Sequence, residues 1–161
     1  MASTTFSGPV TSTNGFVGNL TGNVTGNLTG NVTGDMAGTG RITHATTAAI
    51  NATATATAAQ VATGYITSTS AAPTTITLPT GTLLGTQLSA AKGTIFDLYV
   101  DNTGGASTVT IAVATNGIKS DAANTTAASF GQLTVASGVT GLARFTLMFS
   151  SATAYVFTRT A

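Results

Sequence analysis

The chain contains no cysteine, no tryptophan and no glutamate, and only 6% of its 161 residues are charged, against about 25% in an average soluble protein. Without cysteine, disulfides, thiolate nucleophiles and cysteine-based metal sites are excluded. A formal net charge of +1 supplies no field that would attract nucleic acid or anionic lipid. We therefore expect neither a nucleic-acid partner nor a membrane partner.

The sequence also lacks a basic N-terminal signal and an apolar run long enough to span a bilayer. We therefore expect the chain to be made and assembled in a cytoplasm. Its polar side chains are mostly threonine, serine and asparagine, and a surface with so few charges is poorly protected against association. This composition predicts a protein whose working state is an assembly.

A tetrapeptide, Gly-Asn-Leu/Val-Thr, is repeated four times within residues 18–38. The apolar side chains recur at every fourth position, which fits neither a long helix nor an ordinary two-sided strand. In an extended chain, one face would alternate glycine with leucine or valine, and the other asparagine with threonine. We take the apolar positions in and before the repeat as candidate interface residues: Phe6, Phe16, Leu20, Val24, Leu28, Val32 and Met36.

The repeat cannot order itself as a single copy. Each tetrapeptide offers one leucine or valine, worth about 1.5–3 kcal/mol when buried, whereas ordering four residues costs roughly 4–8 kcal/mol. Its apolar ridge must therefore be buried elsewhere. Either three parallel copies wrap an axis, or each copy lies across the subunits of a larger assembly.

Composition divides the chain into three parts. Residues 1–43 form an extended arm that contains the repeat, and residues 44–62 form a linker of mostly alanine and threonine. We expect this linker to be a strand or extended chain, although alanine would also permit a helix. Residues 63–161 form the folded domain.

Short alternating runs separated by turn residues make residues 63–161 typical of an antiparallel all-β domain, a β-sandwich of the jelly-roll kind. The clearest hairpin joins runs 94–100 and 108–115, and a polar loop follows at 116–129. Further strands are expected at 64–69, 74–78, 130–136, 142–150 and 152–160, with one helical turn within 80–88. The predicted core comprises Ile76, Leu78, Phe96, Leu98, Val100, Val109, Ile111, Val113, Leu133, Val135, Phe145, Leu147 and Phe149.

Few residues could carry chemistry. His44 is the only histidine and has no acid near it in the sequence, so we interpret it as an ordinary polar residue. Asp97 and Asp101 stand about 13 Å apart on one strand face, too far for a carboxylate dyad, and we interpret them as solvated charges at a sheet edge. We predict no enzyme activity, no cofactor and no metal site.

A family resemblance is carried by the first quarter of the chain. Residues 1–10, Met-Ala-Ser-Thr-Thr-Phe-Ser-Gly-Pro-Val, followed by a Gly-Phe pair and the tetrapeptide array, resemble the N-terminal part of small virion proteins of tailed bacteriophages, cyanophages especially. The β-domain is similar, in architecture only, to capsid decoration (cement) proteins and head-fibre proteins. The resemblance implies a homotrimer that binds the major capsid protein, stiffens the head from its outer surface and is assembled in the host bacterial cytoplasm.

Three classes of function are compared on this basis. The leading hypothesis is a capsid decoration protein whose arm engages the capsid or sister chains. The alternative is a head- or tail-fibre protein that binds a host receptor, although the lack of tryptophan disfavours sugar stacking. A virion hydrolase would need a constellation of acid, base or nucleophile that the sequence does not supply.

Overall fold

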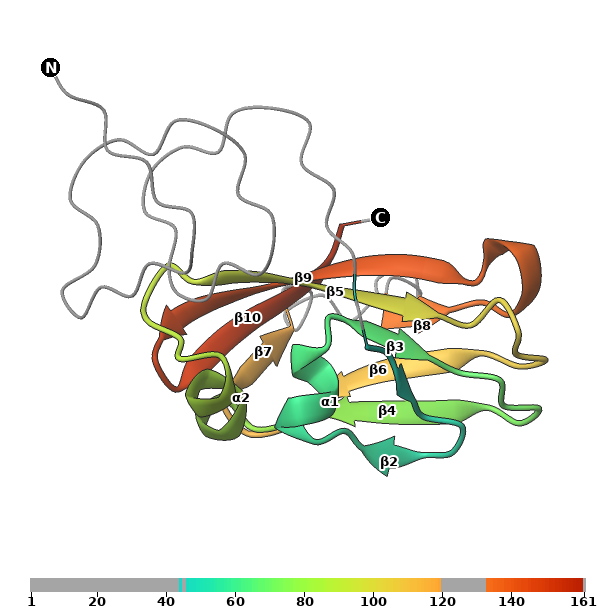
Figure 1. The fold of residues 1–161 in the computed structure, drawn as a ribbon, viewed down its shortest axis with the longest axis horizontal. Helices are drawn as coiled ribbons and strands as arrows, with labels where there is room; N and C mark the ends of the chain where they lie inside the picture. Colours follow the sequence, from blue (N-terminus) through green and yellow to red (C-terminus); the bar gives the residue numbers. More distant parts are fainter. Residues whose placement is uncertain (1–43, 45, 120–132, 161) are drawn as a thin grey trace, which may run out of the picture. The chain divides into compact units, whose positions relative to one another are not determined.

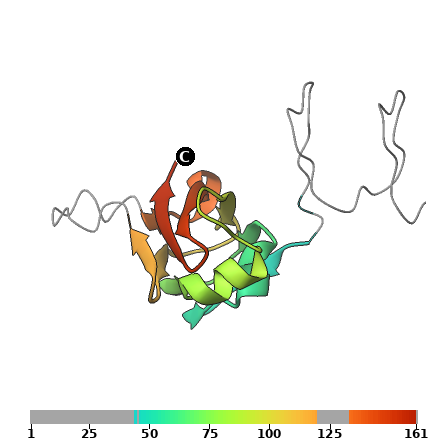
Figure 2. The same ribbon diagram turned by 90° about the vertical axis from the view of Figure 1, so that its left-hand side faces the viewer.

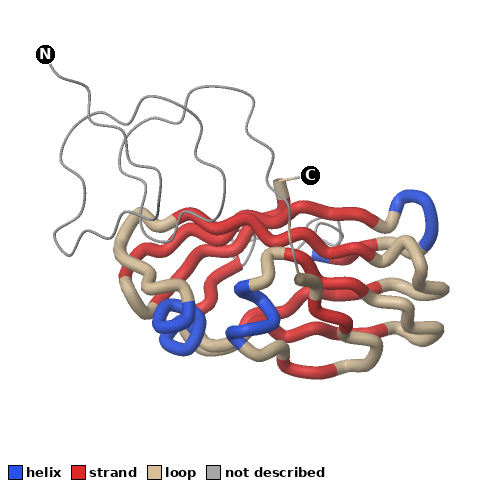
Figure 3. The backbone as a smooth tube through the Cα atoms, in the orientation of Figure 1, coloured by secondary structure: helices blue, strands red, loops and turns tan. Residues whose placement is uncertain are grey.

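The computed structural model describes residues 44, 46–119 and 133–160 (Figure 1). They form a mostly β domain of two facing sheets with mixed strand directions and few short helices (Figure 3). The six-stranded sheet has the order β1-β3-β5-β9-β10-β7. Its strands are β1 (Ala48–Ala49), β3 (Tyr65–Thr67), β5 (Ile95–Asp101), β9 (Leu142–Ser151), β10 (Ala154–Arg159) and β7 (Gly117–Lys119).

The second sheet has four strands in the order β2-β4-β6-β8. They are β2 (Ala54–Thr55), β4 (Thr74–Leu78), β6 (Val109–Val113) and β8 (Thr134–Val135). From β1 to β9 the chain changes sheet with every strand. As a result, β1, β3 and β5 pair in parallel, as do β2, β4 and β6. Antiparallel pairing is confined to β5–β9, β9–β10 and β6–β8.

This alternation corrects two predictions. The sheets are mixed and not purely antiparallel, and the predicted hairpin between runs 94–100 and 108–115 is wrong, because β5 and β6 lie in different sheets. Both runs turn alternate apolar residues toward a shared core. A turn within one sheet and an arch between two sheets leave the same period-two pattern, so the sequence could not separate them. The strands predicted at 142–150 and 152–160 are confirmed as β9 and β10, which pair antiparallel.

The core lies between the sheets and contains the predicted residues, of which Phe96 and Val113 are only partly buried. Further side chains that were not predicted to be in the core are also buried, including Ile66, Leu84, Tyr155 and Phe157. The Tyr155 hydroxyl lies in this core and donates a hydrogen bond to the Pro79 carbonyl at 2.9 Å.

Residues 44–62, which we expected to be a linker, contribute to the two-sheet domain in their described part. Strands β1 and β2 each extend a sheet by parallel pairing. Their neighbours Ile50, Ala56 and Val61 are buried in the core. Within the alternating alanine and threonine run, Ala54 and Thr55 on β2 are exposed and Ala56 is buried.

Helix α1 (Ala58–Ala62) begins at a capping box in which Thr57 and Gln60 exchange side-chain and backbone hydrogen bonds. Helix α2 (Gly81–Gln87) confirms the predicted helical turn and begins at Thr80, whose hydroxyl accepts from the Leu83 amide at 3.3 Å. The two helices pack together at one end of the domain (Figure 2). A short 3-10 helix, η2 (Gly138–Thr140), precedes β9.

Candidate functional site

The candidate site is the face of the six-stranded sheet that points away from the core, here called the outer face. Along β5 and β9 every second residue is buried, for example Leu98 and Phe145, and the residues between them are exposed or half-buried. Strand register sets these outer side chains in rows across β3, β5, β9 and β10. Side chains from distant parts of the sequence therefore meet on one surface.

Three rings gather at one side of the outer face. Tyr65 on β3 pairs with Tyr99 on β5, and their rings stack with centroids 6.3 Å apart. The His44 ring lies 5.9 Å from Tyr65 and 5.6 Å from Tyr99, and its Nδ1 is 2.9 Å from the Thr63 carbonyl. Gly64 has a φ of +73°, and a Cβ there would collide with His44. Glycine at this position thus permits both the turn and the approach of the histidine.

An open pocket adjoins this aromatic cluster. Its described lining is mostly apolar, with one acidic residue: His44, Tyr65, Ile95, Phe96, Asp97, Tyr99 and Leu142. No sequence pattern indicates this cluster, because His44, Tyr65 and Tyr99 are far apart along the chain. His44, interpreted as an ordinary polar residue, forms ring contacts and a hydrogen bond to the backbone.

Tyr65 is held in place by a carboxylate. Its hydroxyl donates to Asp101 Oδ2 at 2.9 Å, while the Thr103 amide and hydroxyl donate to Asp101 Oδ1 at 2.9 and 2.6 Å. The hydrogen bonds from Thr103 hold the pKa of Asp101 below its usual value. Desolvation, followed by the hydrogen bond to Asp101 and its negative charge, raises the pKa of Tyr65. The shift favours the protonated form of Tyr65, which is the form that donates to Asp101.

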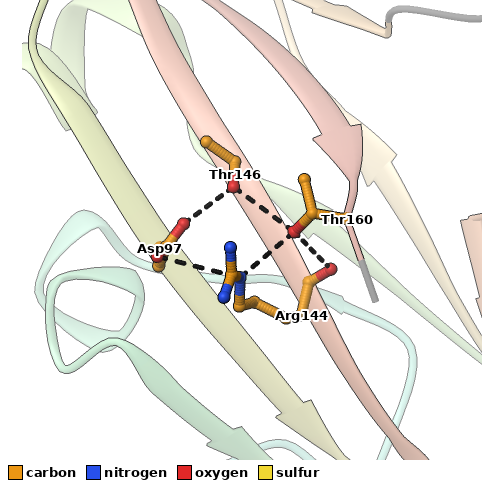
Figure 4. A network of polar contacts seen from close by, with 4 residues as sticks. All are labelled: Asp97, Arg144, Thr146 and Thr160. Atoms are coloured by element: carbon orange, nitrogen blue, oxygen red, sulfur yellow. Dashed lines mark hydrogen bonds and ion pairs between the residues drawn. The ribbon is translucent and has the colours of Figure 1, made fainter.

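A second polar group crosses β5, β9 and the end of β10 (Figure 4). The Thr146 hydroxyl donates to Asp97 Oδ1 at 2.7 Å, and Arg144 Nε lies 3.8 Å from Asp97 Oδ2. Arg144 Nε also donates to the Thr160 hydroxyl at 3.2 Å. Because the Asp97 and Arg144 side chains are 41% and 44% exposed, this ion pair contributes at most about 1 kcal/mol. The pair links the side chains of neighbouring strands β5 and β9.

The two aspartates were wrongly placed at a sheet edge. They lie on β5, which has β3 on one side and β9 on the other. Each has hydrogen-bonding partners on the outer face or at the end of β5.

Exposed apolar side chains complete the outer face. Five large apolar residues are exposed in the described part of the chain, and three of them lie here: Ile95 at 65%, Leu142 at 51% and Met148 at 49%. Ile95 and Met148 are register partners on adjacent strands. They form an exposed apolar pair across β5 and β9.

This arrangement is suited to non-covalent binding. Within the described residues, no group of three or more histidine, cysteine, aspartate or glutamate side chains could hold a metal ion. No helix in that same part of the chain is long and apolar enough to cross a membrane. The interface residues predicted in and before the repeat lie outside the described residues: Phe6, Phe16, Leu20, Val24, Leu28, Val32 and Met36.

Comparisons with known proteins give no relative for this chain: no protein-family model, curated protein or solved structure matches it.

Proposed function

We propose that this chain is a structural virion protein that binds the head of a tailed bacteriophage as a homotrimer and stabilises the capsid. The observation that carries the proposal is the Gly-Asn-Leu/Val-Thr repeat, which offers one apolar side chain in four and so needs a partner to become ordered. The resemblance of residues 1–10 to phage virion proteins supplies the kind of partner. Sister chains and the major capsid protein are the surfaces proposed for the repeat.

The outer face gives independent support to a role in assembly. Its exposed apolar side chains include the Ile95 and Met148 pair, and its charges are few and already have partners. Covering such a face costs little desolvation free energy, because its polar groups keep their hydrogen bonds while its apolar groups are removed from water.

The decisive experiment compares heads that carry the protein with heads prepared without it. Both preparations are heated and exposed to chemical stress, and release of packaged DNA is measured. We expect earlier release from the bare heads and recovery when purified protein is added back. Equal resistance of bare and decorated heads would refute the cementing role.

A second candidate, a fibre protein that binds a host receptor, is favoured by the aromatic cluster beside the open pocket. The rings of Tyr65 and Tyr99 present an apolar body with a polar tip, a combination common in recognition surfaces. Imaging virions that carry a label at residue 161 separates the two functions. Label over the whole shell indicates decoration, whereas label at one vertex or on the tail indicates a fibre.

A further inference from the structure

We infer that Asn116 is a site of spontaneous deamidation, and that its reaction is controlled by opening of β7 at the edge of the six-stranded sheet. In this reaction the Gly117 backbone nitrogen attacks the Asn116 side-chain carbonyl carbon, a C–N bond forms, and ammonia leaves. Water then opens the resulting succinimide to aspartate or isoaspartate, so no co-reactant other than water is needed. The inference goes beyond the proposed function and does not depend on it.

The fold favours an asparagine followed by a glycine between β6 and β7. Asn116 has a φ of +63°, in the left-handed region that asparagine tolerates better than most residues other than glycine. At Gly117 a Cβ would collide with the Tyr155 ring and hydroxyl. Glycine is also the least hindered residue to follow a reacting asparagine, because it places no Cβ beside the attacking nitrogen. Two packing requirements therefore produce a reactive pair.

The Asn116 side chain is available for the reaction. It is exposed, and it makes no hydrogen bond within residues 44, 46–119 and 133–160. Asn102, by contrast, is fully buried, and its amide is held by three carbonyls. Of these two asparagines, only Asn116 has a side chain that is free to cyclise.

The turn before β7 withholds the attacking nitrogen. The Gly117 N–H donates to the Ala114 carbonyl at 3.0 Å, and a proton held in such a hydrogen bond is protected from removal by base. The Asn116 carbonyl accepts from the Tyr155 amide at 3.1 Å. Because this carbonyl and the Gly117 nitrogen belong to one rigid peptide plane, moving the nitrogen breaks both hydrogen bonds. The reaction therefore requires β7 to separate from β10.

Strand β7 opens more readily than the strands beside it. It has three residues, and β10 is its one neighbour in the sheet as described. Strand β10, in contrast, pairs with β9 along its whole length. A short edge element with few hydrogen bonds opens locally at a lower free energy than the central strands. Deamidation thus proceeds in the folded chain at a rate set by this local opening.

The two products differ in their effect on the sheet. Either one adds a negative charge to a chain whose formal net charge is +1. Aspartate leaves the backbone unchanged. Isoaspartate lengthens the backbone by one methylene between residues 116 and 117, and it converts the carbonyl that accepts from Tyr155 into a carboxylate. The pairing of Gly117 with Tyr155 then no longer fits, and we expect β7 to leave the sheet.

The test follows the reaction in the full-length chain, folded in buffer and unfolded in guanidinium chloride, at one mildly alkaline pH. Trypsin cleavage after Lys92 and Lys119 releases peptide 93–119 for mass spectrometry, and the Asn-Gly pair at 14–15 lies in a different peptide. We expect conversion to be roughly 30-fold slower in the folded chain, because two hydrogen bonds must break first. Asn116→Gly, which permits the positive φ, is the control and should abolish the conversion in both states.

Hydrogen exchange gives an independent measure of the same opening. The protection factor of the Gly117 amide, measured by NMR on the folded wild type, reports how rarely its hydrogen bond to Ala114 is released. We expect the slowing of deamidation to match this protection factor. In the purified isoaspartate product we expect the Tyr155 amide to lose its protection, while amides that pair β5 with β9 keep theirs.

Any of four results would overturn the inference. Equal rates in the folded and unfolded chains would show that the turn does not withhold the nitrogen. Conversion that persists in Asn116→Gly would place the reaction at another residue. A Gly117 protection factor far from the measured slowing would separate the reaction from β7 opening. A Tyr155 amide that stays protected in the isoaspartate product would show that β7 remains in the sheet.

Discussion

Replacing Asn102 with alanine should cost far more stability than truncating an exposed asparagine of the described domain. Asn102 is fully buried just after β5, where the chain leaves the six-stranded sheet for the other sheet. Its Nδ2 donates to the carbonyls of Ser107, Val135 and Ala136 at 2.8, 3.2 and 3.0 Å. One amide thus joins the arch between the sheets to the end of β8.

The size of the effect follows from those three contacts. The amide has two hydrogens, and each hydrogen bond contributes roughly 1 kcal/mol net, with a further 1–3 kcal/mol for carbonyls left without a donor. Part of this cost is offset because Asn102 Oδ1 is itself buried without a partner, and alanine removes it. We expect about 2–4 kcal/mol of lost unfolding free energy, which lowers the Tm by roughly 10 °C in a chain of this size.

Chemical denaturation followed by circular dichroism measures this loss. Asn51→Ala is the matched control, because Asn51 is exposed and accepts one hydrogen bond, from the Thr69 amide at 2.9 Å. We expect the control to cost about 1 kcal/mol or less. If Asn102→Ala were no more destabilising than Asn51→Ala, the arch would not depend on this amide and the reasoning would be wrong.

Three further predictions concern other parts of the chain. Gly85→Ala should destabilise the domain by about 1–3 kcal/mol, because a Cβ there would collide with the Ala152 carbonyl in the β9–β10 turn. Thr82→Ala, on the exposed side of the same helix, is the control and should leave stability nearly unchanged. Thermal unfolding of the two variants measures the difference. Because folding lowers the pKa of Asp101, its contribution to the free energy of unfolding is complete above the unfolded pKa of 3.8 and is lost as pH falls through the folded pKa. Asp101→Asn should therefore make the free energy of unfolding fall less steeply as the pH is lowered. An unchanged dependence on pH in the acid range would contradict this. Leu20→Asn combined with Leu28→Asn should abolish trimer or capsid binding while leaving the β-domain folded, as judged by sedimentation and circular dichroism, and retained assembly would refute the assignment of the repeat.

Sequence patterns located most strands of the β-domain but not their pairing, and β7 (Gly117–Lys119) is a strand where the sequence predicted part of a polar loop. The strand predicted at Thr74–Leu78 is found there, and the alternation along β5 correctly separates buried Leu98 from outer Tyr99. Such alternation identifies which face of a strand is buried, because side chains repeat every two residues. It does not identify the neighbouring strand, which is why the arch after β5 was mistaken for a hairpin.

The outer face was harder to predict, because its residues are joined by register and not by sequence. Tyr65 and Tyr99 become neighbours only through parallel pairing of β3 with β5, and Arg144 approaches Asp97 only through β9. The part that the alanine-rich segment plays in the two-sheet domain was not predicted, for a different reason. Small residues carry a weak hydrophobic signal, so burial of Ala56 could not be distinguished from an extended linker.

The most direct test of the account is the mass of the full-length wild-type chain in solution, measured by sedimentation equilibrium over a range of concentrations. The account predicts a discrete particle with three times the 15.8 kDa mass of one chain. A compact monomer at every concentration would contradict it, because the repeat would then need no other copy.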